Sequence, residues 1–215
     1  MSVEKTTFRW NGGEVSGALH HADGGTDYLV LGHGAGAPMH APKLVTYADY
    51  LASRGIGVVR FNFPYTEAGR KAPDRQPVLE ECYTAVAQAV ASRAKRLFLG
   101  GRSMGGRIGT HVAANGFHCD GLVLLSYPLH PPGKPEKLRT AHLPDINAPM
   151  LFVQGSRDTF ATPALLHDTI ESLPTATLYV VKGADHGHSV RGRTMEDVAR
   201  ELVEATTSWI ARISP

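Results

Sequence analysis

Short apolar runs of strand length alternate with amphipathic segments along the chain. This alternation is typical of βαβ units, and it predicts a mostly parallel sheet with helices on its faces. The expected buried strands are residues 28–31, 56–63, 97–99, 121–125, 150–153 and 178–181. Upstream, residues 6–10 and 14–20 flank Asn11-Gly12-Gly13, a hairpin signal that predicts an antiparallel pair at the sheet edge.

Helices are expected where apolar residues recur at steps of three and four. They are residues 42–54, residues 78–91, a helix after residue 103 that ends at Asn115-Gly116, one opening at Thr162-Pro163, and a last helix capped by Thr194. Residues 64–77 are expected to be a polar loop. Residues 126–148 form a proline-rich crossing that is too short for a helical lid. The whole chain, 1–215, is therefore predicted to be one α/β domain without a lid domain.

Composition narrows the class of protein. A chain of 215 residues can bury a full core without metal or disulfide support. Its formal net charge of +2 does not suggest a nucleic-acid partner. Cys82 and Cys119 belong to no spaced Cys/His cluster, so we expect reduced, structural cysteines, no metal and no cofactor. No apolar stretch approaches the ~18 residues of a membrane span, so we expect a soluble, cytoplasmic protein with no membrane partner.

The candidate chemistry begins at Ser103, which lies in a Gly-x-Ser-x-Gly pattern between Gly101 and Gly105. The pattern follows a buried strand and precedes a helix, which is typical of a nucleophile elbow. In such a turn the backbone is strained, and bulky neighbours two residues away would collide. A glycine-rich turn in an ordinary α/β protein is the alternative.

A serine needs a base to accept its proton and a carboxylate to orient that base. Asp158 and His186 each follow a later strand, in the chain order that such elbows use. His188 is the rival base, and Asp185 the rival acid. We favour His186, which is closer to its strand, and Asp158, because Asp185 adjoins the base and would have difficulty reaching the far ring nitrogen. The alternative role for Asp158 is a surface turn residue.

Donors for a developing oxyanion are expected at two places. One is the backbone N–H of Met104, directly after the serine, and the other is in residues 33–37, after the first central strand. Ala35 is the best candidate in this loop, with Gly36 as the alternative. We expect His33 to anchor the loop by hydrogen bonding rather than to transfer protons. The loop lacks the lysine and glycine spacing of a phosphate cradle, which disfavours nucleotide binding.

These residues together resemble the small lidless α/β-hydrolases related to dienelactone hydrolase, within a branch of predicted hydrolases that includes a human testis-expressed hydrolase-like protein. The matching segments are residues 31–37, 60–65, 100–107, 154–158 and 185–186. The resemblance implies an α/β-hydrolase fold, with a mostly parallel central sheet flanked by helices, and a triad of Ser103, Asp158 and His186. It implies no substrate. Dienelactone hydrolases proper carry a cysteine nucleophile, so the serine here disfavours dienelactone.

We therefore predict a serine hydrolase that acts on carboxylic esters or thioesters through an acyl-enzyme on Ser103. Two alternatives stay open: a catalytically idle scaffold of the same fold, and an acyltransferase with the same residues. Arg102, beside the serine, is expected to pair with a carboxylate rather than to face substrate. Arg70, Lys71 and Arg75 in the loop 64–77 are expected to be a solvated charge run rather than an anion-recognition site.

Overall fold

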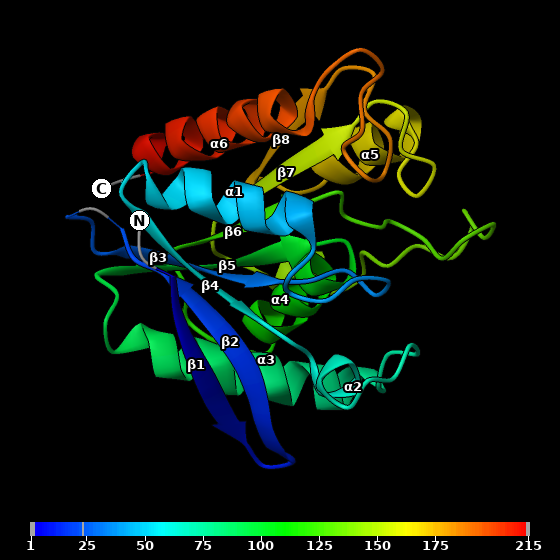
Figure 1. The fold of residues 1–215 in the computed structure, drawn as a ribbon. Helices are drawn as coiled ribbons and strands as arrows, with labels where there is room; N and C mark the ends of the chain where they lie inside the picture. The colour runs from blue at the N-terminus through cyan, green and yellow to red at the C-terminus, as the bar shows by residue number, and fades with distance from the viewer. Residues whose placement is uncertain (1–2, 23, 214–215) are drawn as a thin grey trace.

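The computed structural model describes residues 3–22 and 24–213, and these form an eight-stranded sheet with helices on both faces (Figure 1). Residues 1–2, 23 and 214–215 of the predicted 1–215 domain lie outside the described residues. The strands run in the order β1-β2-β4-β3-β5-β6-β7-β8. Their bounds are β1 (Val3–Trp10), β2 (Gly13–His20), β3 (Asp27–Gly32), β4 (Ile56–Phe61), β5 (Arg96–Arg102), β6 (Gly121–Leu125), β7 (Met150–Gly155) and β8 (Ala176–Val181).

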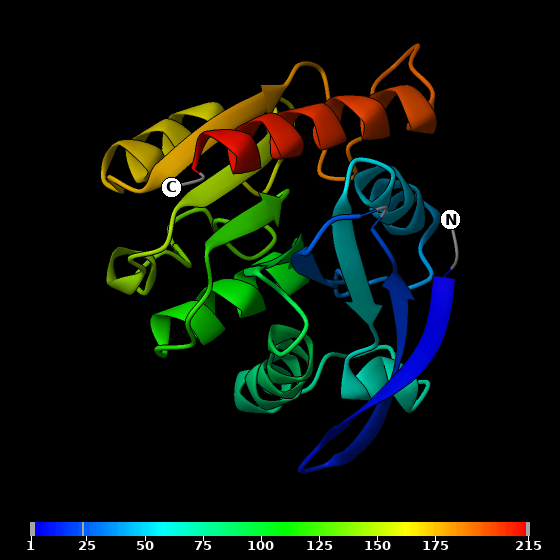
Figure 2. The same ribbon diagram turned by 90° about the vertical axis from the view of Figure 1, so that its left-hand side faces the viewer.

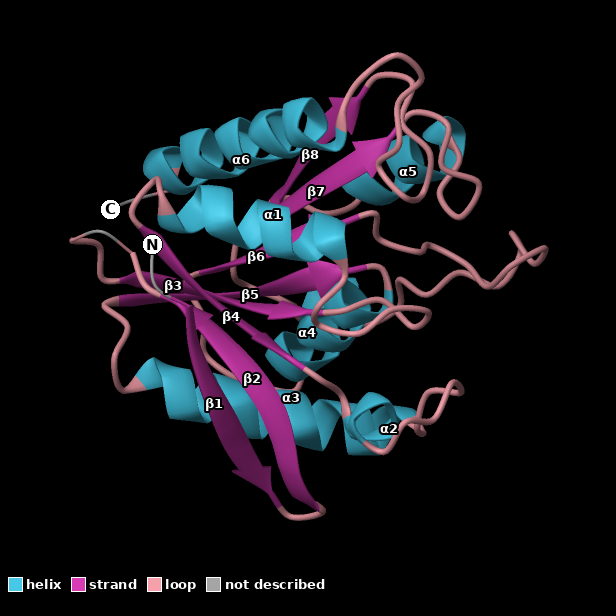
Figure 3. Ribbon diagram, in the orientation of Figure 1, coloured by secondary structure: helices cyan, strands magenta, loops and turns pink. Residues whose placement is uncertain are grey.

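Strand direction follows the predicted pattern. β1 pairs with β2 and β2 with β4 in antiparallel register, whereas every neighbouring pair from β4 to β8 is parallel. The loops that follow the parallel strands therefore leave the sheet at the same edge (Figure 3). In open α/β sheets this carboxyl edge is where ligands bind.

Helices cover the sheet from two sides (Figures 1 and 2). Helices α1 and α6 pack on one face, and α3, α4 and α5 pack on the other, each layer with its own apolar core. The strands between these layers have nearly continuous apolar sequences because helices cover both of their faces. The helix bounds are α1 (Pro42–Ala52), α2 (Pro64–Glu67), α3 (Gln76–Ala91), α4 (Met104–Ala114), α5 (Pro163–Glu171) and α6 (Met195–Arg212).

Several local signals in the sequence are confirmed. Gly55, the glycine expected to end the helix 42–54, follows α1 with φ +82°, a conformation that glycine adopts without steric cost. Thr194 and Asp197 form a reciprocal capping box at the start of α6. Cys82 and Cys119 are unpaired and buried, and burial raises the pKa of each thiol to about 12.

The segment 64–77 is not the loop that was predicted. Pro64 begins the short helix α2, where its fixed φ suits the first helical position. Glu67 at the end of α2 accepts hydrogen bonds from the N–H and the hydroxyl of Ser16, at 3.1 and 2.7 Å. Gln76, within the same segment, already belongs to α3. Contacts with β2 therefore fix a turn that the polar composition concealed.

The prediction that residues 178–181 form a buried strand is also wrong. β8 is the edge strand of the sheet, and its residues are mostly half-exposed, with Val180 48% exposed. An apolar strand at an edge has one neighbour only, which the sequence pattern does not reveal.

Between β6 and β7, residues 126–149 contain only a 3₁₀ turn, Leu143–Asp145, and no α-helix. The predicted absence of a helical lid in this crossing agrees with the structure. No helix among residues 3–22 and 24–213 has the length and apolar character needed to cross a membrane.

Candidate active site

The turn between β5 and α4 places Ser103 at the carboxyl edge of the sheet. Its backbone has φ 51° and ψ −114°, a conformation that residues other than glycine rarely adopt. The Ser103 N–H donates to the Leu125 carbonyl at 2.8 Å, which ties the turn to β6. A Cβ added at Gly101 or Gly105 would lie 2.5 or 2.2 Å from the carbonyl oxygen of Gly32. Both flanking positions therefore have to be glycine, as the predicted elbow requires.

The structure brings Ser103, His186 and Asp158 together. The Ser103 Oγ lies 2.9 Å from His186 Nε2, and His186 Nδ1 lies 2.8 Å from Asp158 Oδ2. The Asp158 side chain is completely buried, and that of His186 is 23% exposed. The alternative that made Asp158 a surface turn residue is therefore wrong.

Two contacts aim the Asp158 carboxylate. The Gln154 side-chain amide donates to Oδ2 at 2.6 Å, and the Phe160 N–H donates to Oδ1 at 2.8 Å. Because Oδ2 accepts the Nδ1–H of His186, the Nε2 of that ring is left free to accept from the Ser103 hydroxyl. The Phe160 ring also packs against the His186 ring, with centroids 4.4 Å apart.

Sequence reasoning missed Gln154 and Phe160. The one signal available for Gln154 was a polar residue at the end of a buried strand, and nothing in the spacing distinguished Phe160.

The rival base and acid have other roles. His188 is buried, and its Nε2 lies 3.1 Å from the hydroxyl of Ser126. Burial lowers the pKa of His188 to about 4, which keeps the ring neutral near pH 7. Asp185 accepts the N–H groups of Gly187 and Ser189, both at 2.8 Å, and so shapes the turn that carries His186.

The loop after β3 passes close to the serine. A Cβ on Gly34 would lie 3.8 Å from the Ser103 Cβ. His33 anchors this loop as predicted: its Nε2 accepts from the Phe63 N–H at 3.0 Å, and its Nδ1 donates to the Gly34 carbonyl at 2.8 Å. Burial lowers the pKa of His33 to about 4, so the ring acts as a neutral connector. The Tyr65 hydroxyl donates to the Ala35 carbonyl at 3.0 Å and so fixes Ala35, the residue after Gly34.

The candidate oxyanion donors lie in α4 and in the loop after β3. The Met104 N–H belongs to the first residue of α4, where no helical carbonyl is available to accept it. Ala35 and Gly36 are both exposed on the loop, so the alternative between them stays open.

Arg102 does not pair with a carboxylate, contrary to expectation. Among the described residues it makes no ion pair within 4.0 Å, and its Nη2 donates instead to the main-chain carbonyl of His186 at 3.1 Å. Burial lowers the pKa of Arg102, while Asp185 and Asp158 oppose that shift. In the segment 64–77, Arg70 pairs with Asp74 at 2.7 Å.

Metal ligation has little support in this part of the molecule. Over the described residues, no three His, Cys, Asp or Glu side chains are grouped so that they could hold a metal ion.

A mostly parallel sheet with a glycine-flanked serine at a strand-to-helix turn, and a later Asp and His beside that serine, defines an α/β-hydrolase fold. The chain belongs to the alpha/beta hydrolase domain family, whose model matches residues 25–213. Within this family the narrower branch named above stays a prediction.

Solved structures share this fold. An α/β serine hydrolase homologue of Coxiella burnetii is 21% identical, with 95% of this chain and 97% of the other covered and a TM-score of 0.77. A lidless α/β serine hydrolase of Xanthomonas campestris is 22% identical, covering 97% and 95%, with a TM-score of 0.76. A dienelactone hydrolase of Anabaena variabilis is 18% identical, covering 96% and 97%, with a TM-score of 0.76. At these identities the likeness establishes the fold.

Proposed function

We propose that this chain is a serine hydrolase that cleaves carboxylic esters or thioesters through an acyl-enzyme on Ser103. The observation that carries the proposal is the continuous hydrogen-bonded path from Ser103 Oγ through His186 to the buried Asp158 carboxylate. The family to which the chain belongs supports the same class of reaction.

The first half-reaction forms the acyl-enzyme. The Ser103 oxygen attacks the carbonyl carbon of the substrate while its proton passes to Nε2 of His186. The imidazolium that forms is stabilised by Asp158, which stays ionised. Collapse of the tetrahedral intermediate breaks the bond to the leaving alcohol or thiol, and His186 gives its proton to that leaving group.

Negative charge on the carbonyl oxygen peaks in the tetrahedral intermediate. In the proposed site the N–H groups of Met104 and Ala35 donate to that oxygen. Both donors belong to a backbone that is already fixed, one by the start of α4 and the other by the Tyr65 hydroxyl. Such donors need no reorganisation as the charge develops.

The second half-reaction regenerates the serine. A water molecule gives a proton to His186 Nε2 and attacks the acyl carbon, and the ester bond to Ser103 breaks. The carboxylic acid leaves, and the proton on His186 returns to the Ser103 oxygen. The partly exposed His186 side chain gives water access to the base.

A fluorophosphonate probe tests the nucleophile directly. We expect covalent labelling of the wild-type chain and no labelling of Ser103→Ala, measured by intact mass. As a matched control, Ser126→Ala removes another buried serine at the same sheet edge and leaves Ser103 in place. Folded wild-type protein that is never labelled would favour the idle-scaffold alternative.

Turnover separates the substrate classes. We expect release of p-nitrophenol from p-nitrophenyl esters of graded acyl length, and of thiol from the matching thioesters, both abolished by Ser103→Ala. Appearance of the free acid distinguishes hydrolysis from acyl transfer to an added alcohol. A labelled enzyme that yields only the transferred ester would make the chain an acyltransferase.

A further inference from the structure

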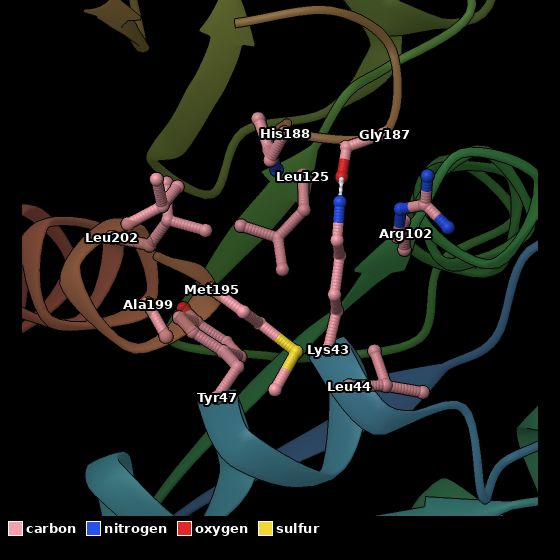
Figure 4. Close-up of a pocket in the computed structure, with 11 residues that line it drawn as sticks. Lys43, Leu44, Tyr47, Arg102, Leu125, Gly187, His188, Met195, Ala199 and Leu202 are labelled. Atoms are coloured by element: carbon pink, nitrogen blue, oxygen red, sulfur yellow. Dashed lines mark hydrogen bonds between the residues drawn. The ribbon is translucent and has the colours of Figure 1, made fainter. Parts of the chain in front are cut away.

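Residues 185–189, the segment that carries His186, accept hydrogen bonds from two cationic side chains, Lys43 and Arg102. Figure 4 shows the bond from Lys43 to Gly187. Lys43, in the first turn of α1, donates from Nζ to the Gly187 carbonyl at 2.6 Å and to the Ser189 hydroxyl at 2.7 Å. Arg102, at the end of β5, donates to the carbonyl of His186 itself. Two successive carbonyls of one loop thus bind side chains from two different elements.

We propose that Lys43 and Arg102 are positioning residues that hold His186 at hydrogen-bonding distance from Ser103, an inference that rests on the proposed hydrolase function. Catalytic groups on loops depend on a rigid scaffold for their placement. Here each cation donates to a main-chain carbonyl of the segment, Lys43 to that of Gly187 and Arg102 to that of His186.

The two cations connect the base to the rest of the site. Arg102 directly precedes Ser103, so its contact with the His186 carbonyl joins the residue beside the nucleophile to the main chain of the base. Lys43 comes two residues after the loop 33–41, which includes the candidate oxyanion donor Ala35. β5, which leads to Ser103, and α1, which follows the loop with Ala35, therefore both contact the segment that carries His186.

Residues 185–189 are also connected to one another by hydrogen bonds. The Asp185 carboxylate accepts two N–H groups within it, and the His188 N–H donates to the Asp185 carbonyl at 2.9 Å. On its other side, His188 lies against Ser126, at the end of β6. Because these hydrogen bonds connect residues 185–189 to one another, a contact at Gly187 or Ser189 also acts on the position of His186.

The surroundings of the cations argue against an incidental surface contact. Lys43 and Arg102 line a cavity of about 30 Å³ whose other walls include the apolar side chains of Leu44 and Leu202. Burial lowers the pKa of both groups, and Asp185 opposes the shift in each. Lys43 and Arg102 are both partly buried, and the main-chain carbonyl that each one contacts offsets part of the cost of removing its charge from water. Among the described residues, the buried Nε of Arg102 has no hydrogen-bond partner.

The test uses Lys43→Met and Arg102→Met, each with a matched control. Lys182→Met removes an exposed lysine from the same loop, and Arg157→Met removes an exposed arginine that adjoins Asp158 in the chain. Steady-state hydrolysis of a p-nitrophenyl ester gives kcat and KM, and deuterium uptake reports on the amides of residues 183–190. Thermal unfolding checks that each variant is folded.

We expect kcat to fall roughly 10- to 100-fold in both test variants, with KM within about twofold of wild type, because a displaced base slows the chemical step and leaves substrate binding intact. Uptake in residues 183–190 should rise in the same variants and not in the controls. Lys43→Arg should recover part of kcat, since a guanidinium also donates to carbonyl oxygens.

Three outcomes would overturn the inference: test variants that match their controls in kcat, a rise in KM with kcat unchanged, or a loss of kcat without faster exchange in the loop. Each of these needs an active wild type and leaves the proposed function standing. A wild-type chain that neither turns over esters nor reacts with the fluorophosphonate probe would instead contradict the proposed function, and with it the positioning role of Lys43 and Arg102.

Discussion

Among single residues, Asp158 offers a substitution that hardly changes the shape of the side chain and should still lower kcat strongly. Asp158→Asn keeps the size of the side chain but places an amide where His186 Nδ1–H needs an acceptor. The imidazole then favours the wrong tautomer and no longer accepts from Ser103. We expect kcat for ester hydrolysis to fall by about 10⁴-fold, with little change in KM.

The comparison variant for Asp158→Asn is Asp145→Asn, an exposed carboxylate in the 3₁₀ turn between β6 and β7. It should retain wild-type kcat. Equal kcat in Asp158→Asn and wild type would remove Asp158 from the proposed mechanism.

The strained backbone of Ser103 leads to a prediction about stability. Ser103→Ala and Ser103→Gly both delete the hydroxyl and its hydrogen bond to His186, so that loss cancels between them. Only glycine adopts φ 51° and ψ −114° without steric strain. Urea unfolding should give Ser103→Gly the larger free energy of unfolding, by about 1 kcal/mol. A more stable alanine variant would mean that the turn stores no strain.

Residue identities were predictable from sequence where a position rule applied. Ser103, Asp158 and His186 each follow a strand that ends at the carboxyl edge, so their meeting could be expected. Lys43 and Gln154 contact the same site through a carbonyl or a carboxylate oxygen and follow no spacing rule. The partner of Arg102 was predicted wrongly for a related reason, because main-chain carbonyl acceptors leave no trace in a sequence.

At the scale of elements, the fit of α4 against β3 depends on Gly105. An alanine Cβ there would lie 2.2 Å from the Gly32 carbonyl oxygen, and backbone atoms cannot give way as a flexible side chain can. Gly105→Ala should therefore lower the free energy of unfolding by about 1–3 kcal/mol. Gly36→Ala is the control for stability, since nothing lies within 4 Å of its added Cβ. Equal unfolding midpoints in the two variants would contradict this account.

Element boundaries show what periodicity can and cannot predict. α6 was predicted from its apolar steps and its cap, because Thr194 and Asp197 supply each other's hydrogen bonds within one local segment. α2 was missed because Glu67 is held by Ser16, 51 residues away. β8 was predicted as buried because its residues are apolar, although edge position is a property of the whole sheet. Local causes were thus predictable, and distant contacts were not.

At the scale of the whole molecule, histidines buried in the neutral form make the fold sensitive to acid. Burial lowers the pKa of His33 and of His188 to about 4, and lowers that of His142 to about 3. In the unfolded chain these side chains have their ordinary pKa, near 6.5. Between pH 6.5 and 4 the unfolded chain therefore binds more protons than the folded one. The stability contributed by the neutral rings is complete above pH 6.5 and is lost as the pH falls towards 4.

The share of His188 in this acid sensitivity can be isolated by substitution. Its backbone has φ +52°, which asparagine tolerates better than most residues, so His188→Asn removes the ionisable ring with little added strain. Each buried neutral histidine contributes a slope of about 1.4 kcal/mol per pH unit within the window. Urea unfolding at pH 7.0, 6.0, 5.5 and 5.0 should show wild-type stability falling with pH, and a fall that is shallower by about that slope in His188→Asn. His118→Asn, which removes an exposed histidine, is the matched control for the loss of one imidazole. Parallel curves for wild type and His188→Asn would show that His188 is not held neutral by the fold.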